Sequence, residues 1–179
     1  MIRFLLRRGL AKFEAEHDYD ATYLREIAES WPAAAIRLQA LSLVSQMKGP
    51  APEVWAGALL ASTLDGDCGP CVQLSVGFAR RAGVPAQPIA ACLAGRPETA
   101  GDTGLGFRFA RAVIADLPEA EALRAEIRAA HGERAVIAAA FAAASGRVYP
   151  MLKRAMGHGQ TCRQVEIDGV VHPVARVAP

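Results

Sequence analysis

Apolar residues recur at spacings of three and four along most of the chain, which is the period of an amphipathic helix. The first long pattern covers residues 21–47 and is broken at Ser30-Trp31-Pro32, because Pro suits the first position of a new helix and Ser30 can cap it. Further helices are expected over residues 53–64, 71–82, 88–94, 107–115, 119–130, 133–146 and 150–157. The pattern therefore predicts an all-α fold.

Two segments depart from this helical pattern. The glycine-containing stretch 98–106 is expected to be a loop. Near the end of the chain, the β-rich runs RQVEI and VVHPV flank Asp168-Gly169, the strongest short-range signal for a two-residue hairpin turn. Pro173 would confine the second run to a sheet edge. We expect this short C-terminal hairpin to dock on the helices or on another subunit, because a lone hairpin is marginally stable.

Length and composition favour a single domain over residues 1–179, with a helical core at about 41–159 and a hairpin tail at 163–179. The chain is 52% hydrophobic but only 6% aromatic, which suits helices packed closely through small side chains. Its net charge is +2 and its basic residues are scattered, so no nucleic-acid partner is expected.

The opening segment, MIRFLLRRGL, is too short and too charged for a signal peptide or a membrane span. It is either a small amphipathic arm or an ordinary first turn that packs Leu5 and Leu6. We therefore expect a cytoplasmic protein with no membrane partner, in a reducing compartment where cysteines more often serve catalysis or metal binding than a disulfide framework.

The cysteines of the sequence DGDCGPCVQL, Cys68 and Cys71, carry the clearest candidate chemistry. They open a predicted helix, whose free N–H groups and macrodipole stabilise a negative sulfur. A thiolate is the form that attacks peroxides and disulfides, so the pair indicates a dithiol redox site. Two alternatives stay open. The pair can be two small buried hydrophobes at a tight helix junction, or it can bind a metal if two more ligands are supplied, for which the nearest grouping is His158 with Cys162.

Helical spacing puts Cys68, Cys71, Leu74, Ser75 and Phe78 on one face of that helix, and directs Gln73 away from it. Asp67 is expected to cap the helix. A carboxylate beside Cys68 would raise the pKa of its thiol and oppose activation.

The remaining cysteine and histidine residues have ordinary interpretations. Cys92 lies among Ile89, Ala90 and Leu93 and is expected to be a core thiol. His17 is expected on the solvated surface, His131 near a helix end and His172 in the hairpin. Any of the histidines can supply a base to the cysteines from a distance.

The motif Cys-Gly-Pro-Cys invites comparison with thioredoxin, but the preceding GALLASTLDGD predicts a helix and a turn instead of a strand. The segment EVWAGALLASTLDGDCGPCVQLSVGFARRAGV resembles the AhpD-like alkylhydroperoxidase family, which includes carboxymuconolactone decarboxylases. That family has a helix, a short turn, and Cys-x-x-Cys at the start of a long helix ending in Ala-Gly. The later segments FRFARAVIADLPEAEALRAEI and ERAVIAAAFAAASGRVYPMLKRAMGHG are similar to its following helices, so the resemblance covers residues 41–159.

The resemblance implies an AhpD-like helical bundle that forms a homo-oligomer and needs no metal or organic cofactor. It implies that Cys71 attacks peroxide and Cys68 resolves the disulfide, whereas simple access favours the opposite order. The family's redox members carry a His where this chain has Ser75 and a Glu where it has Ala56; the nearest upstream acid is Glu53. A serine can donate a hydrogen bond to a thiolate but cannot act as a base near neutral pH.

We therefore expect a thiol–disulfide redox protein, an alkylhydroperoxidase-type antioxidant enzyme with peroxiredoxin-like activity. Its catalytic residues would be Cys68, Cys71 and Ser75, with Glu53 and Asp67 as candidates for a proton relay. It would take a hydroperoxide or another small molecule as substrate and would need a thiol reductant as partner. The alternatives are a non-redox carboxymuconolactone decarboxylase-like binding protein or enzyme, and a structural oligomer without chemistry.

Overall fold

The computed structural model describes residues 2–161 and 163–175, and its fold is all-α with a short C-terminal hairpin, as the sequence predicts. Its helices are α1 (Ile2–His17), α2 (Thr22–Ser30), α3 (Pro32–Ser45), α4 (Pro52–Asp65), α5 (Gly69–Arg81), α6 (Ala86–Leu93), the 3-10 turn η1 (Pro97–Thr99), α7 (Gly101–Ile114), α8 (Glu119–His131), α9 (Glu133–Ser145) and α10 (Val148–Ala155). The strands are β1 (Gln164–Ile167) and β2 (Val170–Pro173).

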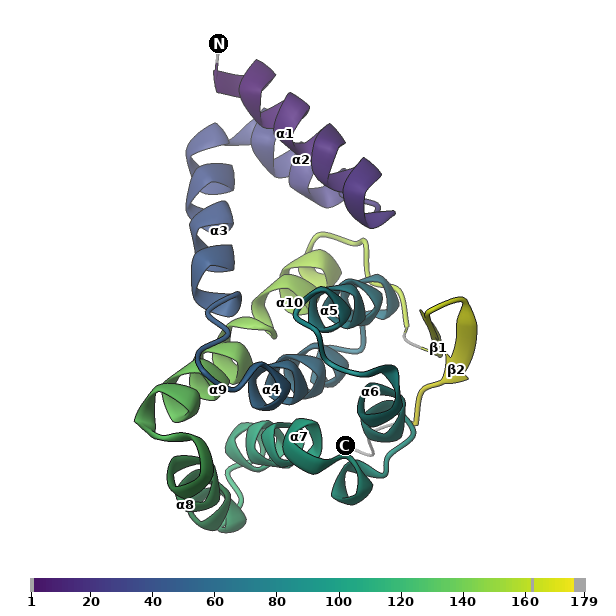
Figure 1. The fold of residues 1–179 in the computed structure, drawn as a ribbon. Coiled ribbons are helices and arrows are strands. Elements are labelled where there is room, and N and C mark those ends of the chain that lie inside the picture. Colours follow the sequence, from purple (N-terminus) through teal and green to yellow (C-terminus); the bar gives the residue numbers. More distant parts are fainter. Residues whose placement is uncertain (1, 162, 176–179) are drawn as a thin grey trace.

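Helix α4 is the centre of the core. Every residue from Val54 to Leu64 is buried, because small or apolar side chains surround the helix on all sides. Helices α5, α7 and α9 pack around it (Figure 1). The turn at the end of α4 leads directly into α5, so the residues between the two helices are held by the most buried element of the fold.

Helices α4 and α7 approach each other closely through glycines. A Cβ at Gly57 would overlap with the carbonyl oxygen of Thr103, and a Cβ at Gly106 with the carbonyl oxygen of Val54. The prediction of a loop over residues 98–106 is therefore wrong, because α7 begins at Gly101. Gly106 allows close packing against α4 and Gly104 against η1, and these contacts outweigh the low helix propensity of glycine.

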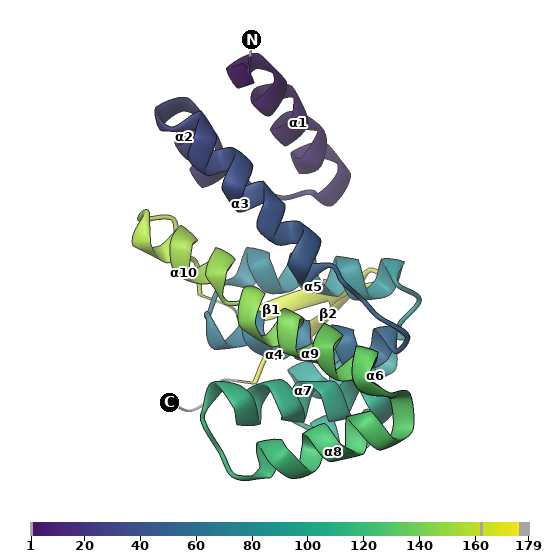
Figure 2. The same cartoon turned by 90° about the vertical axis from the view of Figure 1, so that its left-hand side faces the viewer.

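Helices α1, α2 and α3, here called the N-terminal arm (residues 2–45), extend away from the core (Figures 1 and 2). No residue of α1 is fully buried, and Leu5 is 60% exposed. The opening is thus a long helix of an arm and not a first turn that packs Leu5. The arm returns to the core after α1, where Tyr19, Ala21 and Tyr23 are buried.

The hairpin forms in the predicted register, with Val165 opposite His172 and Ile167 opposite Val170. Asp168 and Gly169 have φ values of 51° and 81°, the left-handed pair that a tight hairpin turn requires. Val165 and Ile167 are buried against the helices. The end of the expected tail, residues 176–179, lies outside the described residues.

Side chains of α5 hold the hairpin in place. The amide of Gln73 donates to the carbonyl oxygen of Glu166 at 2.8 Å and accepts from its backbone N–H at 2.7 Å, and Arg80 pairs with Asp168 at 2.8 Å. Gln73, expected at a surface or interface, therefore continues the strand's hydrogen bonding within the same chain. The hairpin docks on the helices, which was one of the two expected arrangements.

Within the described part of the chain, one helical stretch, Glu133–Ala155, is long and apolar enough to cross a membrane by length and composition. Half of its most apolar window is buried inside the structure. Helix α9, which makes up most of the stretch, packs against α4 and α8. The apolar composition of this stretch therefore matches the packing of a core helix.

Candidate functional site

The two cysteines lie where α4 turns into α5. Asp67 adopts a left-handed φ of 45°, and Cys68, not Asp67 as expected, occupies the N-cap position of α5. Pro70 lies in the first turn, where its missing N–H costs no hydrogen bond. Cys68 and Cys71 are 1% and 4% exposed and are both free thiols. The first turn of α5 thus holds two buried thiols side by side at a helix N-terminus.

The two thiols differ sharply in acidity. The pKa of Cys68 is lowered to about 7. The largest cause is the hydrogen bond from the Cys71 thiol, which acts against the opposing effect of burial. The Cys71 backbone N–H, Lys153 and Arg154 contribute smaller effects in the same direction. The same hydrogen bond and burial strongly raise the pKa of Cys71. The pair therefore carries its negative charge on Cys68 and its proton on Cys71.

Two tyrosines and a lysine enclose this pair. The Tyr19 hydroxyl lies 3.8 Å from the Sγ of Cys71, and Tyr19, Tyr23 and Lys153 are all buried. Burial raises the pKa of both phenols, so they stay protonated. The Cys71 thiol therefore faces a neutral hydroxyl, and the Lys153 ammonium lies over the ring of the same tyrosine.

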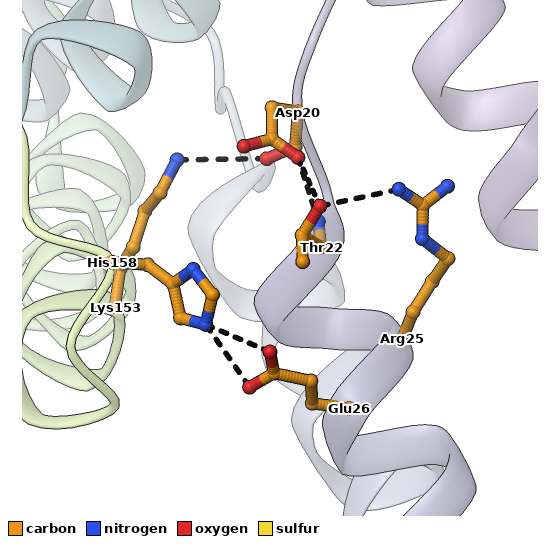
Figure 3. Close-up of polar contacts among 6 residues, drawn as sticks. All are labelled: Asp20, Thr22, Arg25, Glu26, Lys153 and His158. Carbon is orange, nitrogen blue, oxygen red and sulfur yellow. Dashed lines mark hydrogen bonds and ion pairs between the residues drawn. The ribbon is translucent and has the colours of Figure 1, made fainter.

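Contacts between α10 and the start of α2 hold the arm against the core (Figure 3). The Lys153 ammonium lies 3.5 Å from the backbone carbonyl oxygen of Asp20. The imidazole Nε2 of His158 lies 3.0 Å from both carboxylate oxygens of Glu26. The Asp20 carboxylate accepts hydrogen bonds from the backbone N–H and hydroxyl of Thr22 at 2.9 and 2.6 Å. These contacts keep Tyr19 and Tyr23 beside the cysteines.

An apolar cavity of about 400 Å³ separates the arm from α4 and α5. Cys71 and Ser75 lie in its wall, whereas Cys68 does not. The Ser75 hydroxyl donates to the carbonyl oxygen of Cys71 at 3.0 Å. Apolar side chains from both sides complete the wall: Leu6, Leu10, Phe13, Leu38, Leu59, Leu74 and Phe78. Of the two cysteines, Cys71 is therefore the one that a small apolar molecule in this cavity would contact.

The two candidate relay carboxylates, Glu53 and Asp67, lie in different parts of the fold. Glu53 lies in the first turn of α4, whereas Cys68 follows its last turn. A rise of 1.5 Å per residue separates Glu53 from the end of α4 by about 18 Å. Asp67 precedes Cys68 directly, and its residue is exposed to solvent. The structure therefore brings together Cys68, Cys71 and Ser75, but leaves Glu53 at the far end of α4.

His17 is not the solvated surface residue that the sequence suggested. Its ring packs edge-on against Phe13 and Phe78, at centroid distances of 4.6 and 5.5 Å. Its Nδ1 is buried and has no hydrogen-bond partner among the residues that the structure describes. Burial and, secondarily, the nearby Arg81 charge lower the pKa of His17. A neutral histidine thus forms part of the contact between α1 and α5.

The remaining cysteine and histidine residues that the structure describes lie in other parts of the fold. Cys92 is buried and burial raises its pKa to about 12, which confirms it as a core thiol. His131 pairs with Asp102 at 3.2 Å. Among residues 2–161 and 163–175, no three His, Cys, Asp or Glu side chains gather as a metal site. Cys162, the suggested partner of His158, lies outside the described residues.

Sequence reasoning did not single out Tyr19, Tyr23 or Lys153. One signal was present, because Lys153 follows the buried Pro150 by three positions and therefore shares its face of α10. The tyrosines are separated from Cys71 by too many residues for spacing to indicate contact.

No family model, curated protein or solved structure matches this chain. The geometry of the site is therefore the basis on which its chemistry is interpreted.

Proposed function

We propose that this protein is a thiol–disulfide redox enzyme of the AhpD-like, peroxidase type, in which Cys68 and Cys71 reduce a hydroperoxide. One observation carries the proposal: two free, buried thiols, Cys68 and Cys71, lie at the N-terminus of α5, and Cys71 forms part of the wall of a cavity. The pKa of Cys68, lowered to about 7 chiefly by the hydrogen bond from Cys71, supports it. A dithiol that is partly ionised near neutral pH is poised for oxidation.

The position of each sulfur suggests a division of roles. Cys71 lies in the cavity wall and is the sulfur that a substrate can reach. The singly ionised pair shares one proton across the hydrogen bond, so a shift of that proton from Cys71 to Cys68 places the negative charge on the sulfur that borders the cavity. This arrangement supports the order in which Cys71 attacks and Cys68 resolves. It also supplies a base where the family's His and Glu are replaced by Ser75 and Ala56.

The reaction then proceeds in two steps. Cys68 takes the proton of Cys71, and the Cys71 thiolate then attacks the hydroperoxide. An S–O bond forms and the O–O bond breaks. The leaving alkoxide takes a proton from water. Cys68 next attacks the sulfenic sulfur of Cys71, the disulfide forms, and hydroxide leaves with the Cys68 proton as water. The balance is one thiolate, one thiol and one hydroperoxide to one disulfide, one alcohol and one hydroxide.

The substrate and partners follow from the surroundings of the pair. The apolar cavity wall favours a hydroperoxide with an apolar substituent. A thiol reductant must return the disulfide to the dithiol. Exposed apolar side chains on the arm, among them Phe4, Trp31 and Leu43, support a homo-oligomer.

The activity is tested by following cumene hydroperoxide consumption with dithiothreitol as the reductant. The unmodified protein should turn over, and Cys71→Ser should not. Cys92→Ser, which removes a buried thiol outside the site, should retain activity. Equal rates for the unmodified protein and Cys71→Ser would contradict the proposal.

A second candidate is a non-redox protein that binds a small apolar molecule, favoured by the size and lining of the same cavity. It predicts that Cys68→Ser/Cys71→Ser binds apolar fluorescent probes as tightly as the unmodified protein does, while neither protein consumes peroxide.

A further inference from the structure

Lys153 is an unusual residue because its ammonium group is enclosed by the fold. The residue is 1% exposed. Its Nζ lies 3.5 Å from the backbone carbonyl oxygen of Asp20, which is a long distance for a hydrogen bond. The same atom lies 4.9 Å from the ring centroid of Tyr19 and 5.6 Å from that of Tyr23 (Figure 3 shows the contact with Asp20). Within residues 2–161 and 163–175, no carboxylate forms an ion pair with Lys153.

A buried ammonium without a nearby anion is destabilising, so its surroundings should contain a negative charge. The titratable and charged groups around it come from the α1–α2 turn, α2, α5 and α10: Tyr19, Asp20, Tyr23, Cys68, Cys71, Tyr149 and Arg154.

Most of these groups cannot neutralise Lys153 inside the fold. The tyrosines stay protonated because burial raises their pKa, and Arg154 is itself a cation. The Asp20 carboxylate attracts Lys153 from an exposed position, where water screens it and Thr22 takes its hydrogen bonds. The cysteine pair is buried, and Tyr19, whose ring centroid lies 4.9 Å from the Lys153 Nζ, has its hydroxyl 3.8 Å from the Cys71 Sγ. The charge of Lys153 lowers the pKa of both thiols.

We propose that Lys153 is the buried counter-ion of the thiolate formed by the Cys68–Cys71 pair, and that it holds the pair with one negative charge and one proton. The inference rests on the proposed redox function, since it assigns a charge partner to the same dithiol. Lys153 acts on the sulfurs and on the position of Tyr19, and is therefore a positioning residue.

Neutral substitution of Lys153 tests the assignment through the reactivity of Cys68. The rate of Cys68 alkylation by iodoacetamide is followed against pH by peptide mass spectrometry. In Lys153→Met the pKa of Cys68 should rise, and the rate near pH 7 should fall about fivefold or more, because the rate follows the thiolate fraction. Lys153→Arg keeps the charge and should stay within about twofold of the unmodified protein.

Arg154→Met is the matched control, because Arg154 is the next residue, is exposed and bonds to the carbonyl oxygen of Gly66. Its loss should change the Cys68 rate less than the loss of Lys153 does. An unchanged alkylation profile in Lys153→Met, or an equal effect of Arg154→Met, would overturn the proposal.

Folding is checked on each variant by near-ultraviolet circular dichroism. If Lys153→Met does not fold, Lys153→Gln replaces it, and salt dependence in the unmodified protein gives a further test. A buried counter-ion predicts that the pKa of Cys68 stays constant between about 0.05 and about 1 M NaCl, because buried pairs are little screened. A clear rise with salt would indicate exposed charges and overturn the proposal.

Alkylation does not require turnover, so the two hypotheses fail separately. A loss of Cys68 reactivity in Lys153→Met without peroxide consumption by the unmodified protein would support the counter-ion and contradict the redox enzyme. Peroxide consumption by the unmodified protein, with an unchanged pH profile of Cys68 alkylation in Lys153→Met, would support the redox enzyme and contradict the counter-ion.

Discussion

The hydroxyl oxygen of Tyr19 lies 3.8 Å from the Sγ of Cys71, although 52 positions separate the two residues in the chain. Tyr19 lies in the turn between α1 and α2, whereas Cys71 lies in the first turn of α5. The N-terminal arm therefore contributes directly to the surroundings of the cysteine pair. It also closes the cavity into which Cys71 projects.

Tyr19→Phe should slow the reaction of Cys71 with hydroperoxide. The Tyr19 hydroxyl lowers the pKa of Cys71 against the larger effects of Cys68 and burial, so its removal raises that pKa further. A single hydrogen bond is worth about 1 kcal/mol, which corresponds to a rate loss of about fivefold. Stopped-flow measurement of thiol oxidation checks the effect. Tyr149→Phe, on the same cavity wall, should react at the normal rate, and equal rates for both variants would contradict the role of Tyr19.

Cys71→Ala should make Cys68 less acidic. The hydrogen bond from Cys71 is the largest cause that lowers the pKa of Cys68 to about 7, and alanine cannot donate it. We expect the pKa of Cys68 to rise toward the ordinary value of about 8.5, with a corresponding loss of thiolate near neutral pH. The pH dependence of alkylation measures this shift. Cys71→Ser, which keeps a donor, should show a smaller shift, and an unchanged Cys68 pKa in Cys71→Ala would refute the assigned hydrogen bond.

Gly57→Ala should destabilise the core. A Cβ at this position overlaps with the carbonyl oxygen of Thr103, so α4 and α7 would have to separate. Overpacking of this kind costs about 3 kcal/mol. The free energy of unfolding in urea gives the measurement. Gly77→Ala is the matched control, because its nearest neighbour is the Arg81 guanidinium at 3.6 Å, and it should stabilise α5 by about 0.5 kcal/mol. Similar effects of the two substitutions would contradict the close helix crossing.

His17 should make the fold sensitive to acid. Burial lowers its pKa in the folded protein, so its contribution to stability is complete above the unfolded value of about 6.5 and is lost as the pH falls through the lower, folded value. The melting temperature should therefore fall more steeply below about pH 6.5 in the unmodified protein than in His17→Phe, which keeps a ring between Phe13 and Phe78. Parallel melting curves against pH would rule out this role.

Local sequence signals predicted much of the fold. Asp168-Gly169 supports left-handed φ values at both positions, so the hairpin was readable from two residues. Gly101, Gly104 and Gly106 misled the prediction, because glycine weakens an exposed helix, whereas Gly104 and Gly106 here allow close contact with the carbonyl oxygens of Pro97 and Val54. Helix propensity describes a segment without tertiary contacts. Here packing against α4 determines that the segment from Gly101 onward is helical.

The candidate site was predicted in part. Cys71 and Ser75 line the cavity together, as their helical spacing indicated. The N-cap position of Cys68 differs from the expected cap at Asp67 because the backbone turns one residue later. Tyr19 and Lys153 meet the pair only through tertiary contacts of the arm and α10, which the spacing of residues within one helix does not encode.

The central claim is that Cys68 and Cys71 form a redox-active dithiol, and peptide mapping under non-reducing conditions tests it most directly. The reduced protein is treated with one equivalent of cumene hydroperoxide, alkylated and digested, and then compared with a sample reduced again by dithiothreitol. The account predicts a disulfide between Cys68 and Cys71 that dithiothreitol reverses, with Cys92 still a thiol. Two unreacted thiols at Cys68 and Cys71, or sulfonic acids without any disulfide, would contradict it.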